Sequence, residues 1–325
     1  RETLAREARQ RQLRSELNRN DPAWSIPSDP TEAKVAAARE DRRARDPGER
    51  GAGQSSIARE LWRLQWAGRC EYLEGAIGAT PGAQLRSISE RAATLKGPVP
   101  GTSVADVMTT SPADAIGGRW RLPAFRAGEG TVPTGLLCAV AKSLGEASAQ
   151  FEDASISPTH GIKRPSQYGR DIAGPHLVLI ACDMSGESPI PHIGYAQPIA
   201  SEACLAPVDS EFEREIAIAI IGSLKALRSS DPELEIRVRK PAFSRSLKLG
   251  IARPDFVCQV ESQNGTAHFV IEAMGYTDDA YLASKRVTHP RMAEIGPVEE
   301  IAYADRLSRE DIAAAFADMV RRHAP

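Results

Sequence analysis

Two short apolar segments joined by a turn constrain the fold of this chain more than any other feature. Residues Phe256–Val260 and His268–Ile271 are rich in β-branched and aromatic residues, and the turn Gln263–Gly265 between them contains Asn-Gly, a strong hairpin signal. The two segments are therefore predicted to be antiparallel neighbouring strands. Asp255 opens the first segment and Glu272 closes the second, so the hairpin is expected to bring two carboxylates together.

Two neighbouring carboxylates repel each other unless a cation lies between them. Their oxygen atoms suit a hard divalent ion, Mg²⁺ or Mn²⁺, which can polarise a phosphodiester and activate a water molecule for in-line attack. The pair therefore predicts a metal site. The alternative for Asp255 is that it only caps a turn after Pro254, whereas a lone carboxylate at Glu272, at the end of an apolar strand, would be costly to bury.

Pro254-Asp255 followed by Glu272 seventeen residues later resembles the PD-(D/E)XK nuclease superfamily. The resemblance covers residues 207–325 and implies an αβββαβ restriction-endonuclease-like core with DNA as the substrate. It also implies that a Mg²⁺ or Mn²⁺ ion is bound by Asp255, Glu272 and the backbone carbonyl of Ala273. The superfamily pattern places a lysine two residues after the glutamate, where this chain has Met274.

Some members of the superfamily carry that lysine on the following helix, and Lys285 is the matching residue here. The helix is predicted to begin near Asp278-Asp279, since acidic residues favour a first turn, and to end or kink near Thr288, before Pro290. The resemblance implies that Lys285 orients the attacking water and stabilises transition-state charge. A solvated helix lysine is the alternative.

Helical spacing places Tyr281, Lys285 and Thr288 on one face of this helix, with His289 beside them. Tyr276 and His289 are secondary candidates for binding phosphate or orienting a water molecule. Packing and capping roles for these two residues remain open.

An acidic residue on the preceding helix is the third metal-site candidate. Glu213 falls within an apolar stripe, and the superfamily often places an acid here to support the metal shell or a second ion. Ser210 with Glu213 three residues later is also a capping box, and both interpretations can hold. The stripe consists of Phe212, Ile216, Ile220, Leu224 and Leu227.

Three further elements complete the expected core. Leu234–Lys240 alternates apolar and basic residues, which predicts a strand with one solvated face. Val298–Tyr303 is predicted to be the last strand, and Ser308 to cap a final amphipathic helix. The resulting order of helix, three strands, helix, strand and helix matches the nuclease core.

The overall fold class is predicted to be α/β, or α+β overall, with three parts. Residues 1–54 form a charged arm, flexible or helical, whose arginines either contact DNA phosphates or are simply solvated. Residues 55–206 form an α+β or β-rich domain for recognition of substrate or partner, with strands expected at Leu136–Val140 and His176–Ala181. Residues 207–325 form the nuclease-like domain.

Composition narrows the remaining possibilities. The formal charge of −2 neither requires nor excludes a local nucleic-acid patch, and the five scattered cysteines predict reduced thiols rather than a zinc finger. The sequence contains no apolar run of membrane-spanning length and opens with no signal peptide, so a soluble, cytoplasmic protein without membrane contact is expected. The abundance of alanine and arginine is associated with bacterial sources. A homodimer and a larger protein complex both remain open.

Two function classes follow from these features. The first is a Mg²⁺-dependent DNA endonuclease that hydrolyses phosphodiester bonds. The second is a catalytically inactive relative that uses the same fold to bind nucleic acid or protein in a larger complex, and Met274 is the feature that favours it.

Overall fold

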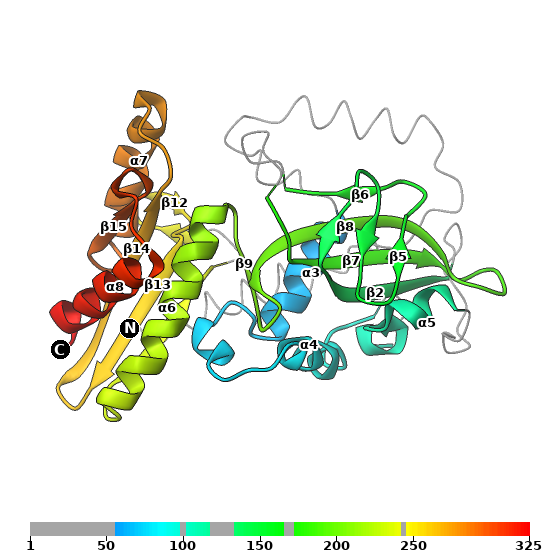
Figure 1. Cartoon of the computed structure of the whole chain (residues 1–325), viewed down its shortest axis with the longest axis horizontal. Helices are drawn as coiled ribbons and strands as arrows, with labels where there is room; N and C mark the ends of the chain where they lie inside the picture. Colours follow the sequence, from blue (N-terminus) through cyan, green and yellow to red (C-terminus); the bar gives the residue numbers. More distant parts are fainter. Residues whose placement is uncertain (1–55, 98–101, 118–132, 166–171, 242–244) are drawn as a thin grey trace. The chain divides into compact units, whose positions relative to one another are not determined.

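The computed structural model describes residues 56–97, 102–117, 133–165, 172–241 and 245–325 (Figure 1). The predicted N-terminal arm lies outside these residues. The described residues form two compact units, which differ from the three predicted parts in that each is built from several segments. The first unit contains the described parts of Arg1–Ala67, Ile88–Arg164 and Val178–Ala196, and the second those of Gly68–Ser87, Pro165–Leu177 and Gln197–Pro325. The predicted boundaries at residues 54 and 206 stay predictions.

The first unit is built around a mixed sheet whose neighbours follow the order β1-β2-β7-β8-β6. β2 and β7 are buried almost throughout, as their continuous apolar sequences require, and both confirm strands predicted from the sequence. The strands in this order are β1 (Met108–Thr109), β2 (Thr134–Ala141), β6 (Ile162–Lys163), β7 (His176–Asp183) and β8 (Ile190–Ser201), and β9 (Cys204–Pro207) pairs with the end of β8.

Short helices and a small sheet complete this part of the chain. A small sheet, β3-β4-β5, contributes Ile156, and Phe151 directly follows its middle strand. Both residues pack in one core with Leu137, Val178 and Ile180 of the larger sheet. The additional elements are α3 (Ser56–Ala67), α4 (Ala83–Ala92), η3 (Val104–Val107), α5 (Pro112–Ile116), β3 (Ser143–Leu144), β4 (Ala149–Gln150) and β5 (Ser155–Ile156).

The second unit contains the predicted αβββαβ order, followed by a final helix, around a sheet with the strand order β10-β13-β14-β15. A small hairpin, β11–β12, was not predicted. The core elements are α6 (Glu211–Ser230), β10 (Glu235–Arg239), β11 (Arg245–Leu247), β12 (Gly250–Ala252), β13 (Phe256–Ser262), β14 (Gly265–Met274), α7 (Asp279–Met292), β15 (Val298–Ala302) and α8 (Arg309–His323). Three short elements accompany them: η2 (Leu73–Ala76), β9 (Cys204–Pro207) and η4 (Tyr303–Asp305).

The strand register explains how two carboxylates meet. β13 and β14 are antiparallel, with Phe256 opposite Ile271, so the next position along β14, Glu272, lies opposite Asp255. β15 is parallel to β14 and pairs Glu300 with Glu272. The hairpin thus places Asp255 and Glu272 at the same end of the sheet, as the sequence predicted.

Side chains on the two faces of this sheet belong to different cores. Val238, Phe256 and Ile271 pack with α6 and α8, which lie side by side against the sheet (Figure 1). Val270 instead packs with Ala252 of β12 and Met292 of α7. Because side chains alternate along a strand, Glu272 and Met274 share the face of Val270, which is the face that α7 approaches.

The predicted cap of α6 is present in part. The Ser210 hydroxyl accepts a hydrogen bond from the Glu213 amide at 3.1 Å, as an N-cap should. The Glu213 carboxylate, however, accepts from the amide of Asp209 at 2.9 Å. Ser308 forms a full capping box with Asp311 at the start of α8.

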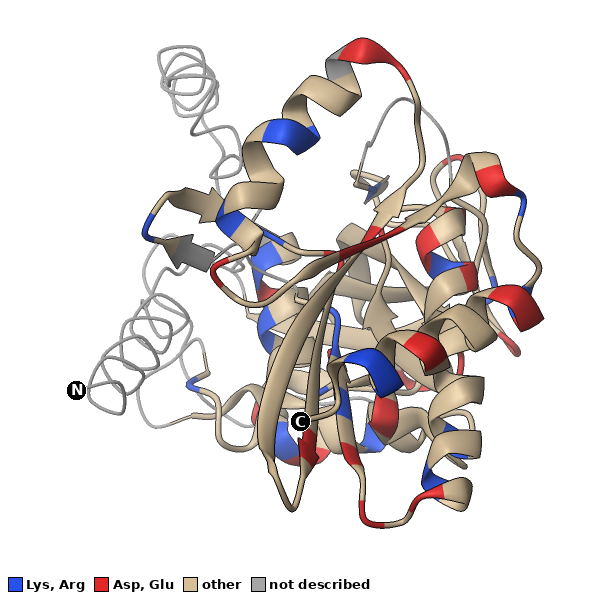
Figure 2. Ribbon diagram, turned by 90° about the vertical axis from the view of Figure 1, so that its left-hand side faces the viewer, with Lys and Arg blue, Asp and Glu red and all other residues tan. Residues whose placement is uncertain are grey.

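Helix α7 continues beyond the predicted end at Thr288. It runs through Pro290 to Met292, so Lys285 lies midway along the helix rather than in its last turn. Pro290 lacks a backbone N–H, so the helix loses one hydrogen-bond donor at this position. The helical hydrogen-bond pattern resumes where the Ala293 amide donates to the His289 carbonyl at 2.9 Å. Figure 2 shows acidic positions at the start of α7 and basic positions farther along it, the distribution that a helix dipole favours.

The segment after α7 passes very close to β14. A Cβ atom on Gly296 would lie 2.1 Å from the carbonyl oxygen of His268, so only glycine fits there. This close approach brings β15 alongside β14.

Two further observations concern helix hydropathy and the cysteines. Among the described residues, no helix is both long enough and apolar enough to cross a membrane. All five cysteines are buried and free, in agreement with the prediction of reduced thiols.

Candidate functional site

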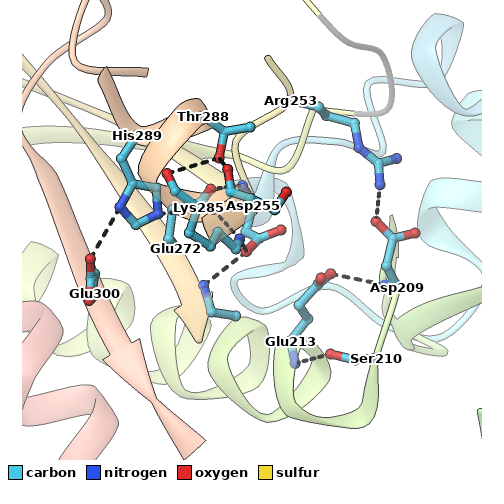
Figure 3. A network of polar contacts seen from close by, with 12 residues as sticks. Asp209, Ser210, Glu213, Arg253, Asp255, Glu272, Lys285, Thr288, His289 and Glu300 are labelled. Atoms are coloured by element: carbon cyan, nitrogen blue, oxygen red, sulfur yellow. Dashed lines mark hydrogen bonds and ion pairs between the residues drawn. The ribbon is translucent and has the colours of Figure 1, made fainter. Parts of the chain in front are cut away.

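Asp255 and Glu272 are held together by reciprocal hydrogen bonds between neighbouring strands. The Asp255 amide donates to Oε1 of Glu272 at 2.9 Å, and the Ala273 amide donates to Oδ2 of Asp255 at 2.9 Å. Figure 3 shows the two carboxylates converging. Since each carboxylate is anchored to backbone, their separation is fixed by the sheet rather than by flexible side chains.

Lys285 reaches these carboxylates from α7. Its Nζ atom lies 2.5 Å from Oε2 of Glu272 and 3.9 Å from Oδ2 of Asp255. Lys285 therefore reaches the face of the sheet on which Met274 lies. Of the two carboxylates, Glu272 is the closer partner of the Lys285 ammonium.

A second lysine, Lys240, lies on the other side of Asp255. Its Nζ atom is 2.7 Å from Oε2 of Glu213, 3.4 Å from Oδ1 of Asp255 and 3.7 Å from Oδ2 of Asp209. The side chain is only 2% exposed. The predicted strand with one solvated face is confirmed by the exposed Glu235 and Arg237, whereas Lys240, just beyond the strand, lies on the buried face.

The sequence contained a signal for the burial of Lys240. Ile236 and Val238 are buried, and Lys240 continues the same two-residue alternation, so it faces the core beside α6. Its ammonium lies 5.4 Å from the centre of the Phe256 ring, the residue that follows Asp255. The alternation therefore could have identified Lys240 as a buried residue of the strand's apolar face.

Glu213 joins the cluster through Lys240 and Asp209. It contacts the Lys240 ammonium rather than the Asp255–Glu272 pair directly. Arg253 forms an ion pair with Asp209 at 2.5 Å (Figure 3). Asp209 and Arg253 were not predicted as site residues, because their ion pair joins positions 44 residues apart in the sequence.

The secondary candidates occupy different places. His289 lies with Nε2 at 3.9 Å from Oε2 of Glu272 and Nδ1 at 3.2 Å from Oε1 of Glu300. Tyr276 is 37% exposed, and its ring packs edge-on against Tyr281 at 5.5 Å. The Tyr281 hydroxyl donates to the Ala273 carbonyl at 3.0 Å, which makes Tyr281 a closer neighbour of the site than Tyr276.

The carboxylates differ in their affinity for protons. Burial opposes ionisation of Asp255, but Lys240 and Lys285 outweigh it and lower the pKa of that carboxyl group. Burial, together with repulsion from Asp255, raises the pKa of Glu272 to about 7 against the attraction of Lys285. Burial likewise raises the pKa of Glu213 to about 8, although Lys240 opposes the shift.

The pKa values of the two lysines and of His289 are shifted in opposite directions. Burial lowers the pKa of a lysine, but for both Lys240 and Lys285 the surrounding carboxylates outweigh burial, and the net pKa is raised. Both ammonium groups are therefore charged at neutral pH. Burial lowers the pKa of His289, which favours its neutral form at neutral pH.

The residues present fit a hard divalent ion. In the part of the chain that the structure describes, no three His, Cys, Asp or Glu side chains form a ready metal cage. Asp255 and Glu272 nevertheless converge, the Ala273 amide donates to Asp255, and a cation, Lys285, already lies against both carboxylates. Mg²⁺ is often held by one or two carboxylates while it keeps several waters, so this donor set suits it.

Two family models match different parts of the chain. A family model described as restriction endonuclease-like C-terminal domain matches residues 209–322. A second model, described as a domain of unknown function (DUF8535), matches residues 27–199, which is more than half of the chain.

A protein of Escherichia coli, described as an uncharacterized protein in the cib 5' region, is 31% identical over 147 residues. The match covers 43% of this chain and 68% of that protein. No solved structure matches the chain. The chain is therefore related to this Escherichia coli protein, carries a restriction endonuclease-like domain at residues 209–322, and belongs to the family defined by the domain of unknown function DUF8535.

Proposed function

We propose that the C-terminal domain is a metal-dependent DNA endonuclease that hydrolyses phosphodiester bonds. The observation that carries this proposal is the convergence of Asp255, Glu272 and Lys285 at one end of the sheet. Two carboxylates in this arrangement can hold an ion for metal-assisted phosphodiester hydrolysis, and a lysine beside them can stabilise the developing charge. The restriction endonuclease-like match over the same residues supports it.

The metal in this proposal is Mg²⁺ or Mn²⁺, held by Asp255, Glu272 and the Ala273 carbonyl. When bound, such an ion supplies Lewis-acid polarisation of the phosphodiester and lowers the pKa of a bound water. Glu272 must be ionised to bind it, and its pKa of about 7 leaves it partly protonated at neutral pH. Ion binding is therefore expected to release protons.

Lys285 supplies the positive charge in the proposed mechanism. Its ammonium is charged at neutral pH and 17% exposed, so it can donate hydrogen bonds to a phosphate oxygen or to the attacking water. Tyr281 orients the strand end by its hydrogen bond to the Ala273 carbonyl. Glu213 acts indirectly, through its ion pair with Lys240. His289 also acts indirectly, through Glu272 and Glu300.

The proposal is tested by incubating the full chain with supercoiled, linear and single-stranded DNA in Mg²⁺ or Mn²⁺. We expect nicked or cut products, none in EDTA, and none from Asp255→Asn. This substitution preserves the side-chain shape, so circular dichroism should show an unchanged fold while calorimetry shows loss of ion binding. Absence of cleavage of every DNA form by the wild-type chain would contradict the enzyme.

A second function is favoured by one observation. Met274 occupies the lysine position of the superfamily pattern, and Lys240 and Lys285 already neutralise the carboxylates by ion pairing. A non-catalytic domain that binds nucleic acid or protein, as a homodimer or within a larger complex, is consistent with this. DNA binding by mobility shift that is unaffected by EDTA, without cleavage in any metal, would favour this alternative.

A further inference from the structure

Lys240 is surrounded by carboxylates in a way that an ordinary structural ion pair is not. Its ammonium lies within 3.7 Å of oxygens from Asp209, Glu213 and Asp255, and its side chain is 2% exposed. These carboxylates come from the start of α6 and the start of β13. An ammonium group has three hydrogen-bond donors, and here it is buried among three carboxylates. Its surroundings therefore resemble those of a metal cation held by carboxylate ligands.

Asp255 is shared between two positive charges. Its Oδ1 faces Lys240 at 3.4 Å, and its Oδ2 faces Lys285 at 3.9 Å. In two-metal phosphodiesterase sites the ions lie about 3.5–4 Å apart and act on opposite sides of the reacting phosphate. Here the Oδ1 side of the shared carboxylate is already neutralised by the protein itself.

We propose that the ammonium of Lys240 takes the place of a second divalent ion, so that the candidate site binds a single ion between Asp255 and Glu272. This inference rests on the proposed function. Lys240 acts as a positioning residue: it fixes Oδ1 of Asp255 and directs the remaining binding capacity of that carboxylate toward Glu272.

The charges around Lys240 support this role. Asp209, Glu213 and Asp255 carry three negative charges when ionised, and Arg253 and Lys240 offset two of them. A divalent ion could enter only by displacing a lysine that is almost completely shielded from solvent. If the ammonium is removed without replacing its charge, the same three carboxylates should attract an ion.

The experiment counts bound ions by isothermal titration of Ca²⁺ into the full chain. We expect one ion for the wild type and for Lys240→Arg, and two for Lys240→Met and Lys240→Gln. Lys225→Met removes an exposed lysine of α6 and should leave the count at one. Circular dichroism in the presence of Ca²⁺ checks that each variant is folded.

The outcomes separate this inference from the proposed function. Two ions bound to the wild type would overturn the inference and leave the proposed metal site standing. One ion in both the wild type and a folded Lys240→Met or Lys240→Gln would also overturn it. No ion in the wild type would overturn the proposed metal-dependent function, and the inference with it. Two ions in the wild type overturn the inference even if neither neutral variant folds.

Discussion

The two sides of Asp255 contain the same kinds of group in different surroundings. On the α6 side, Lys240 is 2% exposed and lies among three carboxylates. On the α7 side, Lys285 is 17% exposed and lies against Glu272, with Asp255 at the edge of contact. One side is closed to solvent, whereas the other remains accessible.

This difference separates a structural task from a chemical one. A buried ammonium is tolerated only when its partners compensate for lost hydration, so Lys240 is committed to its carboxylates. Lys285 needs fewer partners because solvent still reaches it, and in the proposed mechanism it exchanges one of them for a phosphate or a water molecule. The closed side should therefore govern stability, and the accessible side should govern catalysis.

The largest effect should come from the closed side. Lys240→Met leaves three buried carboxylates without their cation and should lower the free energy of unfolding by about 3–5 kcal/mol in EDTA. Chemical denaturation measures this change. Lys225→Met, on the exposed surface of α6, should stay within about 0.5 kcal/mol of the wild type. A similar loss in both variants would remove the distinction between the two sides.

Lys285→Ala should mainly affect the reaction. In the proposed mechanism the Lys285 charge stabilises the transition state, so its loss should lower the DNA cleavage rate by a factor of about 10² or more, and Lys285→Arg should only partly restore it. Steady-state cleavage of plasmid DNA measures the rate, and the unfolding curve should move less than for Lys240→Met. An unchanged cleavage rate would show that the lysine assignment is wrong.

The next largest effect should be the pH dependence of ion binding, which distinguishes Glu272 on the accessible side from Glu213 on the closed side. Glu272 has a pKa of about 7, so below that pH a proton must leave before an ion binds. Affinity for Ca²⁺ should rise by up to about tenfold per pH unit below pH 7 and level off above it. Calorimetry at a series of pH values measures this. A continued rise to pH 8 would instead implicate Glu213, whose pKa is about 8, as an ion ligand.

The smallest expected effect concerns the hydrogen bond from Tyr281 to the Ala273 carbonyl, on the accessible side. Tyr281→Phe removes the hydroxyl that donates to the Ala273 carbonyl and should cost about 0.5–1.5 kcal/mol of stability. Thermal unfolding measures this loss. Tyr276→Phe is the matched control on an exposed neighbour and should change stability less. Equal losses would mean that the Ala273 contact contributes little.

Much of the second unit was predictable because its signals are local. Alternating apolar residues, an Asn-Gly turn and helix caps are set by neighbouring residues, so the helices and strands of the core were anticipated. The register of the hairpin then requires Asp255 and Glu272 to meet. The hairpin β11–β12 and the continuation of α7 through Pro290 were missed, since both depend on packing rather than on local preference.

The sequence by itself determined the two carboxylates, since a tight turn between apolar strands fixes which residues stand opposite each other. Only the tertiary structure decided which cations they meet. Lys240 and Glu213 belong to different elements, and the fold brings them to 2.7 Å, because α6 packs on the face of the sheet to which Lys240 points. Contacts between elements depend on how whole faces pack, and a linear pattern of residues does not specify that.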